Sequence, residues 1–124
     1  MLLQIFRTTQ ENGQTGISQQ TPAPKLNIVG SNITNQSLRA RDVIKITFDR
    51  PVNNESLNLE ITPQEEILPS FNQSLTELSI EPANAWNYDT EYLITILKST
   101  KSTSNLDLGK DYQFKFKTVP YSGI

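Results

Sequence analysis

The 124-residue sequence contains no cysteine and no histidine. Without cysteine, the fold cannot depend on disulfides, and the redox state of its compartment cannot be inferred. The two absences together remove thiolate and imidazole metal ligands, the usual general base near neutral pH, and the Ser-His and Cys-His nucleophile pairs. Catalysis would have to rest on carboxylates, lysine or tyrosine alone. We therefore predict a protein that is not an enzyme and that uses no metal and no cofactor.

An excess of positive charge is also missing. Eleven lysines and arginines stand against thirteen acidic residues, which gives a formal net charge of −2. Such a chain provides no broad positive field for a nucleic-acid backbone or an anionic membrane surface, so we expect neither as the main partner. The length corresponds to about one domain, and a chain of this size can bury a single core without metals or disulfides.

Large apolar residues are scarce at the start of the chain. Residues 7–24 consist mostly of Gln, Thr, Gly, Ser, Asn and Pro, and Ile17 is their only large apolar residue. Because this composition cannot offset the entropy cost of ordering, we predict that residues 1–24 are a flexible N-terminal segment or linker. The apolar stretch MLLQIF at residues 1–6 is too short to span a bilayer. It is either a loose terminus or the remnant of a membrane anchor upstream of the domain.

Alternation of apolar and polar residues dominates the rest of the chain. In VIKITF, residues 43–48, three apolar side chains face one way and Lys45 and Thr47 the other, and Pro51 then ends the strand because it cannot donate to a ladder. Strands are also predicted at residues 25–30, 57–61, 66–68, 78–80, 92–97 and 112–118, of which 66–68 is the weakest. We therefore predict an all-β fold, an antiparallel β-sandwich of about seven strands over residues 25–119, followed by a C-terminal tail at 120–124.

Three motifs follow one another along these strands. They are TFDRPVN at residues 47–53, TEYLITI at 90–96, and a loop with Gly109 that leads into FKFKT at 114–118. This order resembles the bacterial immunoglobulin-like domains of surface-layer and other cell-envelope proteins. There, Thr-Phe-Asp runs into Pro-Val-Asn, and a Thr-x-Tyr-x-Ile-x-Ile strand precedes a glycine-containing loop and a final Phe-x-Phe-x-Thr strand. The resemblance covers roughly residues 25–118, and NLDLGKD departs from the commoner Asp-x-x-Gly-Asn loop.

The resemblance implies an immunoglobulin-like sandwich that acts as a noncatalytic structural or spacer module of a bacterial cell-surface or envelope protein. The expected location is the cell surface, extracellular space or periplasm, with a membrane tether upstream of the domain as one arrangement. Expected partners are neighbouring domains of the same protein, or envelope polymers and proteins in structural or adhesive roles, and the module is expected to be monomeric. The alternative is a carbohydrate- or protein-binding module that uses loop aromatics.

Three aromatic residues are candidates for special roles. Tyr92, at the start of the penultimate strand, fits a tyrosine corner, in which the hydroxyl bonds to backbone just upstream. Trp86 has two interpretations. It either packs over the open end of the core, which we favour, or forms a ligand-contact platform with Tyr88. The strand-end carboxylates show no recognised ion-loop spacing, so we interpret them as solvated charges rather than a calcium site.

Overall fold

The structure is a computed structural model that describes residues 24–33 and 37–121. Most of the predicted N-terminal segment, including the stretch at residues 1–6, lies outside the described residues, as do residues 122–124 of the predicted tail.

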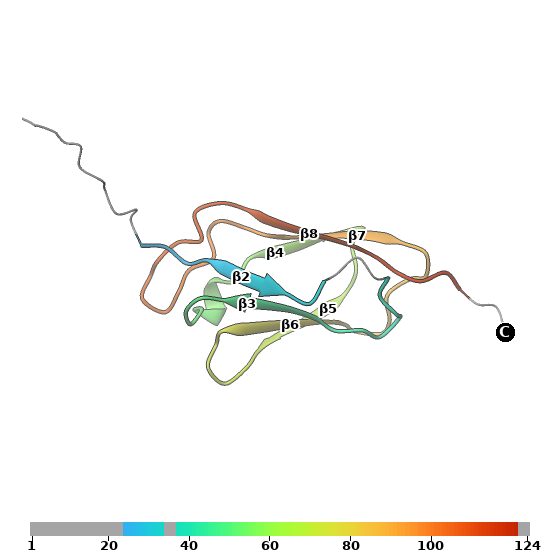
Figure 1. Cartoon of the computed structure of the whole chain (residues 1–124), viewed down its shortest axis with the longest axis horizontal. Coiled ribbons are helices and arrows are strands. Elements are labelled where there is room, and N and C mark those ends of the chain that lie inside the picture. Colours follow the sequence, from blue (N-terminus) through green and yellow to red (C-terminus); the bar gives the residue numbers. More distant parts are fainter. Residues whose placement is uncertain (1–23, 34–36, 122–124) are drawn as a thin grey trace, which may run out of the picture.

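The described chain forms two antiparallel sheets that face each other (Figure 1). The four-stranded sheet has the order β2 (Ile28–Ser31), β3 (Ile44–Phe48), β6 (Glu77–Pro82) and β5 (Ile67–Phe71). The three-stranded sheet has the order β4 (Leu59–Thr62), β7 (Glu91–Ile96) and β8 (Tyr112–Lys117). A short 3₁₀ helix, η1 (Asn54–Ser56), lies between β3 and β4. This division is that of a constant-type immunoglobulin sandwich. The prediction of an all-β sandwich of about seven antiparallel strands is confirmed.

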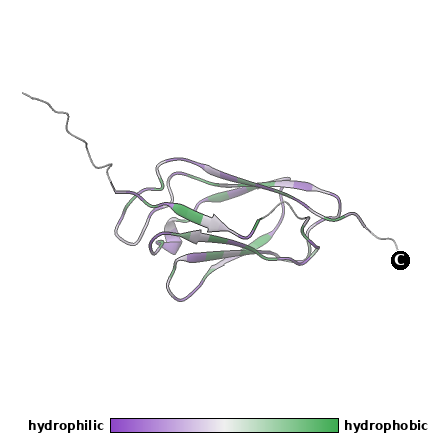
Figure 2. Ribbon diagram, viewed as in Figure 1, coloured by the Kyte–Doolittle hydropathy of each residue, from purple (hydrophilic) through white to green (hydrophobic). Residues whose placement is uncertain are grey.

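The core fills the space between the sheets, as the alternation predicts. In β3, Ile44, Ile46 and Phe48 are buried, while Lys45 is exposed. Opposite β3, Leu78 and Ile80 of β6 lie in register and are also buried. Hydrophobic residues recur along the strands, and the connecting loops are mostly hydrophilic (Figure 2). The buried hydrophobic residues are Leu26, Ile44, Ile46, Phe48, Val52, Leu78, Ile80, Trp86, Tyr92, Ile94, Ile96, Leu108 and Phe116.

Several strands differ in extent from their predictions, and β5 shows a physical reason for the difference. The weak strand expected at residues 66–68 is β5, which continues to Phe71 through Pro69. Proline lacks the N–H that a central strand donates, and the sequence therefore understates the length of this strand. The structure places β5 at the edge of its sheet, where proline is tolerated because only one side of the strand is paired.

The described chain enters the sandwich at one end and leaves it at the other (Figure 1). An odd number of strands that alternate in direction, β2 through β8, produces this arrangement. The β5–β6 turn and the long β7–β8 loop lie at the end where the described chain enters. The β4–β5 connection and the β6–β7 loop lie at the end where it leaves. The two sets of loops are therefore separate surfaces.

Candidate functional site

Trp86 lies in the core and not on the surface. It is 1% exposed, and its ring contacts the rings of Tyr92 and Phe116 at centroid distances of 5.2 Å and 5.1 Å. The indole N–H donates to the backbone carbonyl of Asp42 at 2.8 Å, so its polar atom is satisfied inside the fold. A ligand cannot reach this ring in the structure. The platform interpretation that joined Trp86 to Tyr88 is therefore corrected, because burial separates the two side chains.

Tyr88 is exposed and pairs with a different aromatic residue. Its ring lies 5.1 Å from that of Tyr121, in an edge-to-face arrangement with an interplanar angle of 61°. Tyr88 and Tyr121 are 47% and 66% exposed. The β6–β7 loop supplies one ring and the segment after β8 the other, and the N–H of Asp89 donates to the carbonyl of Val119 between them. Two accessible phenol rings therefore stand together at the end where the described chain leaves the sandwich.

The sequence analysis did not identify Tyr121. Thirty-three positions separate it from Tyr88, and the strand pairing of β7 with β8 brings the two segments together. The available signal was an aromatic residue after Pro120 at the end of the last predicted strand. That signal does not reveal which residue would lie beside it.

Tyr92 makes the contacts of a tyrosine corner. It is fully buried near the start of β7, and its hydroxyl accepts a hydrogen bond from the N–H of Asn87, five residues upstream, at 3.0 Å. The same hydroxyl donates to a carboxylate oxygen of Glu65 at 2.9 Å. Desolvation raises the pKa of Tyr92 above 10.0, and the Glu65 carboxylate adds to this effect, although the bond from Asn87 opposes it. One hydroxyl thus joins β7, the β6–β7 loop and the β4–β5 connection.

Thr118 fixes the same β6–β7 loop from the other side. It is 1% exposed, and its hydroxyl accepts from the N–H of Thr90 at 2.9 Å and donates to the carbonyl of Asn87 at 2.5 Å. A buried hydroxyl is expected to find such partners, because an unpaired one would lose its hydration without compensation. The loop that presents Tyr88 is therefore held by two buried side chains, Tyr92 and Thr118.

A cleft of about 460 Å³ runs along β4. All four residues of β4 line it, together with Gln64 and Glu65 of the β4–β5 connection and Ile67 at the start of β5. Because β4 and β5 are edges of different sheets, the cleft lies where the sandwich is open at its side. Half-buried Leu59 and Ile61 contribute apolar surface, and exposed Glu60 contributes a carboxylate. The charged side chains that line the cleft, Glu60 and Glu65, are both acidic.

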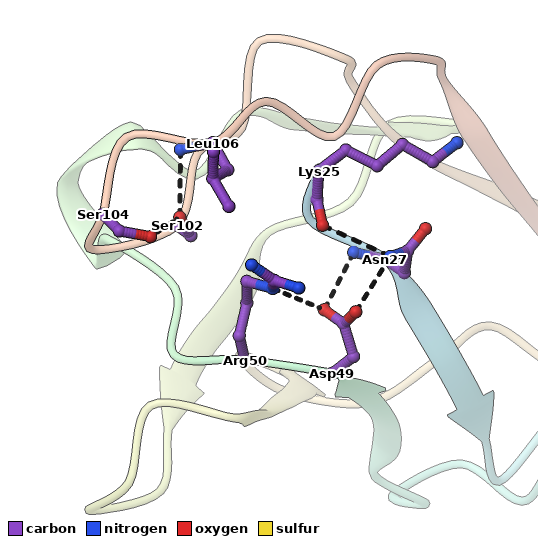
Figure 3. A network of polar contacts seen from close by, with 7 residues as sticks. All are labelled: Lys25, Asn27, Asp49, Arg50, Ser102, Ser104 and Leu106. Carbon is purple, nitrogen blue, oxygen red and sulfur yellow. Dashed lines mark hydrogen bonds and ion pairs between the residues drawn. The ribbon is translucent and has the colours of Figure 1, made fainter. Parts of the chain in front are cut away.

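Asp49 connects the start of the domain to the end of β3 (Figure 3). One carboxylate oxygen accepts from the backbone N–H of Asn27 at 3.0 Å, and the other accepts from the side-chain amide of Asn27 at 2.8 Å. Arg50 lies 3.4 Å from the same carboxylate. Desolvation raises the pKa of Asp49, but the bonds from Asn27 and the Arg50 charge outweigh it, and the pKa falls below 3.8. This carboxylate therefore has a structural role.

The β7–β8 loop is braced by its own polar groups. The hydroxyl of Ser102, a buried residue, accepts from the N–H of Leu106 at 3.0 Å and bonds the hydroxyl of Ser104 at 2.9 Å (Figure 3). Lys101 and Asp107 form an ion pair across the loop. The last carboxylate before β8, Asp111, accepts from the N–H of Lys98 at 2.8 Å.

The carboxylates considered for an ion site do not gather. Across residues 24–33 and 37–121, no three His, Cys, Asp or Glu side chains lie close enough together to hold a metal ion. Asp49, Asp107 and Asp111 are each bonded to neighbouring protein groups. In the same part of the chain, no helix has the length and apolar character needed to cross a membrane.

The comparisons with known proteins agree with this architecture. A family model described as bacterial Ig-like domain matches residues 3–118. The chain is similar to a solved S-layer protein, rSbsC(31-844), with a TM-score of 0.50 and 13% identity over 77% of this chain and 14% of that one. It is also similar to the LD transpeptidase LdtMt1 in complex with imipenem, with a TM-score of 0.48 and 12% identity over 79% of this chain and 41% of that one.

The chain therefore spans a minor part of each of these two proteins, and at 13% identity the likeness to the S-layer protein shows the fold alone. A search of curated proteins found no match.

Proposed function

Because the chain belongs to the bacterial Ig-like domain family, we propose that it serves as a noncatalytic structural module, a rigid spacer within a bacterial cell-surface or envelope protein. The observation that carries the proposal is the placement of the two ends of the described chain at opposite ends of the sandwich (Figure 1). A domain built in this way adds its own length to whatever precedes and follows it. Spacing is then a consequence of the fold and needs no ligand.

The contacts at the two ends support a spacer that keeps its shape. Asp49 ties Asn27 to the end of β3 where the described chain enters. Tyr92 and Thr118 hold the β6–β7 loop at the end where the described chain leaves the sandwich. Hydrogen bonds across elements far apart in sequence restrict bending at both ends, and this restriction makes distance a defined property of the module.

The spacer proposal is tested by location. We expect a C-terminally tagged protein, expressed in its source cell, to fractionate with the envelope and to be removed from intact cells by added protease. A cytoplasmic marker protein that stays protected in the same cells is the control for lysis. Recovery of the tagged protein in the soluble cytosol, resistant to the protease, would contradict the envelope assignment.

A second candidate function is binding through the exposed tyrosine pair. Tyr88 and Tyr121 offer apolar ring faces together with hydroxyl groups, a combination suited to the faces of sugar rings in an envelope polysaccharide. We expect any such binding to be lost in Tyr88→Ala, titrated with soluble cell-wall glycans by calorimetry. Tyr112→Ala is the control, since Tyr112 lies near the opposite end of β8. Equal binding by the wild type and Tyr88→Ala would exclude this site.

A further inference from the structure

Both edges of the three-stranded sheet carry backbone groups that no described residue pairs. Leu97 donates to the carbonyl of Asn58, so residues 60 and 62 direct their backbone groups toward β7, while Leu59 and Ile61 direct theirs outward. On β8, the N–H of Thr118 donates to the carbonyl of Thr90, which shows that every second residue directs its backbone groups toward β7. Gln113 and Lys115 are the residues between these, and they direct their backbone groups outward. Farther along β8, Leu38 covers the edge by donating to the carbonyl of Lys117.

Charge is distributed very unequally between these two edges. The segment at residues 51–97, which includes β4, β5, β6 and β7, has no lysine or arginine. Its acidic residues are Glu55, Glu60, Glu65, Glu66, Glu77, Glu81, Asp89 and Glu91. On the β4 side, Glu60 is exposed and Glu65 lines the adjacent cleft, and exposed Glu66 follows Glu65 directly before β5. The β8 edge instead carries exposed Lys115 and Lys117, of which Lys117 is paired with Asp89, and Lys110 and Asp111 precede it, so lysines outnumber acids at this edge.

The acids of the β4 side form no ion pair within the described residues, although Glu65 accepts a hydrogen bond from the Tyr92 hydroxyl. Among the described residues, the ion pairs are Arg50 with Asp49, Lys101 with Asp107, and Lys117 with Asp89. None of them uses Glu60, Glu65 or Glu66. A protein surface with one sign of charge along one edge and the opposite sign along the other is complementary to a second copy of itself.

We propose that the acidic β4 edge of one copy docks against the basic β8 edge of a second copy and continues the three-stranded sheet from one molecule to the next. Strand addition to an open edge supplies main-chain hydrogen bonds, here through Leu59 and Ile61 on one side and Gln113 and Lys115 on the other. Two β4 edges repel each other through their glutamates, and two β8 edges through their lysines, so the unlike pairing is selected.

This contact joins two different surfaces and does not close on itself. Each docked copy leaves a free β4 edge and a free β8 edge, and copies therefore add in an open row. One pair of edge strands is a small contact beside the roughly 800 Å² per partner that stable complexes bury, so the isolated module associates weakly. Copies held close together on one support would associate much more strongly, because their effective concentration is high. The inference goes beyond the proposed spacer role.

Two charge-reversal variants of the full chain test the docking. The acidic-edge variant carries Glu60→Lys and Glu66→Lys, and the basic-edge variant carries Lys110→Glu and Lys115→Glu. Sedimentation velocity from micromolar to millimolar protein measures association at low salt (~10 mM) and at high salt (~500 mM), where screening removes most of the attraction between exposed charges. We expect the wild type to self-associate at low salt. Each variant alone should associate at least roughly tenfold more weakly than the wild type.

Mixing the two variants is the decisive step. The acidic-edge variant has two basic edges and the basic-edge variant has two acidic edges, so the mixture should regain the association that each lacks alone. On dilution of the wild type, the backbone amide signals of Ile61 and Lys115 should shift in NMR spectra. Thermal unfolding verifies that each variant is folded. As controls, the single reversals Glu55→Lys in η1 and Lys98→Glu just after β7 lie outside both edge strands and should leave association unchanged.

Three results would overturn the proposal: a wild type that stays monomeric at low salt, an association that neither reversal weakens, or a mixture that fails to restore it. In each case the spacer role stands or falls separately, because it is decided by cellular location and not by self-association.

Discussion

At the scale of single residues, the Tyr92 hydroxyl connects two separate parts of the chain. It accepts from Asn87 and donates to Glu65, and these two residues lie in different connections on either side of β5 and β6. Removing the hydroxyl leaves both groups without a partner at a half-buried site. The aromatic ring, in contrast, keeps its stacking with Phe116 at 5.1 Å when the hydroxyl is removed.

We expect Tyr92→Phe to lower the free energy of unfolding by about 1–2 kcal/mol, the range for a lost hydrogen bond that leaves a buried partner unsatisfied. Urea denaturation measures the change. Tyr112→Phe is the matched control, since Tyr112 lies on the neighbouring strand and its hydroxyl makes no hydrogen bond within the described chain. If the two variants lost equal stability, the hydrogen bonds of the Tyr92 hydroxyl would not be the cause of the loss.

The raised pKa of Tyr92 predicts a dependence at alkaline pH. The unfolded chain releases the phenol proton near 10.0, whereas the folded chain holds it to a higher pH because the buried ring disfavours the charged form. The contribution of Tyr92 is therefore complete below pH 10.0 and is lost as the pH rises through the folded pKa. We expect the stability difference between the wild type and Tyr92→Phe to shrink over that window in urea titrations. A constant difference would contradict the raised pKa.

Asp49 predicts the opposite dependence, at acid pH. Its pKa lies below 3.8 in the folded protein, so the stability it adds is present above that value and is lost as the pH falls through the folded pKa. We expect Asp49→Asn to be about 1 kcal/mol less stable than the wild type at neutral pH and nearly equal to it in strong acid. Because Asn27 supplies the bonds, the substitution should cost less on an Asn27→Ala background, which a double-mutant cycle measures.

At this scale, sequence reasoning can anticipate a contact whose partner is local. Tyr92 lies five residues from Asn87, and its hydroxyl contact follows from its place at the start of a strand. The bond from Trp86 to Asp42 spans 44 residues, and the pairing of Tyr88 with Tyr121 depends on how two strands align. Neither can be deduced from composition or spacing, because both depend on the folded arrangement of separate segments.

At the scale of elements, alternation predicted the strands better than the loops. The period-two pattern marks one buried face, so β3, β7 and β8 appear close to where the sequence places them. Residues 97–111 have no such period, and their structure depends on bonds such as that between Ser102 and Leu106. The cleft along β4 also escaped prediction, because it forms between two edges of different sheets.

Gly109 illustrates how the β7–β8 loop depends on backbone geometry. Its φ angle is +87°, a conformation that residues with a side chain rarely adopt. We expect Gly109→Ala to cost about 1 kcal/mol of unfolding free energy, measured by thermal or urea denaturation, because the strain exceeds the gain from a less flexible unfolded chain.

Gly30→Ala is the matched control. Gly30 lies in β2 with nothing within 4 Å of an added Cβ atom, so the substitution should be neutral or slightly stabilising. Equal destabilisation at both positions would show that the left-handed backbone of Gly109 is not what limits the loop.

At the scale of the whole molecule, the sandwich has two independent directions. Along its longest axis, the described chain enters at one end and leaves at the other, which suits a spacer (Figure 1). Across the three-stranded sheet, an acidic edge at β4 lies opposite a basic edge at β8. A chain of modules could therefore extend in one direction while neighbouring chains made contact in the other, without competition between the two.

Both directions depend on a sandwich that folds as one unit, and Trp86 reports this directly. It is the only tryptophan of the chain, and it contacts Tyr92 of β7 and Phe116 of β8 while bonding to Asp42 before β3. Its fluorescence should therefore be blue-shifted in the folded protein and should shift to the red when the two sheets separate. We expect its urea transition to coincide with the loss of β-sheet circular dichroism, as in a two-state domain. An indole transition at lower urea than the dichroism would mean that the tyrosine-corner end opens first, and the module would then be a spacer with one compliant end.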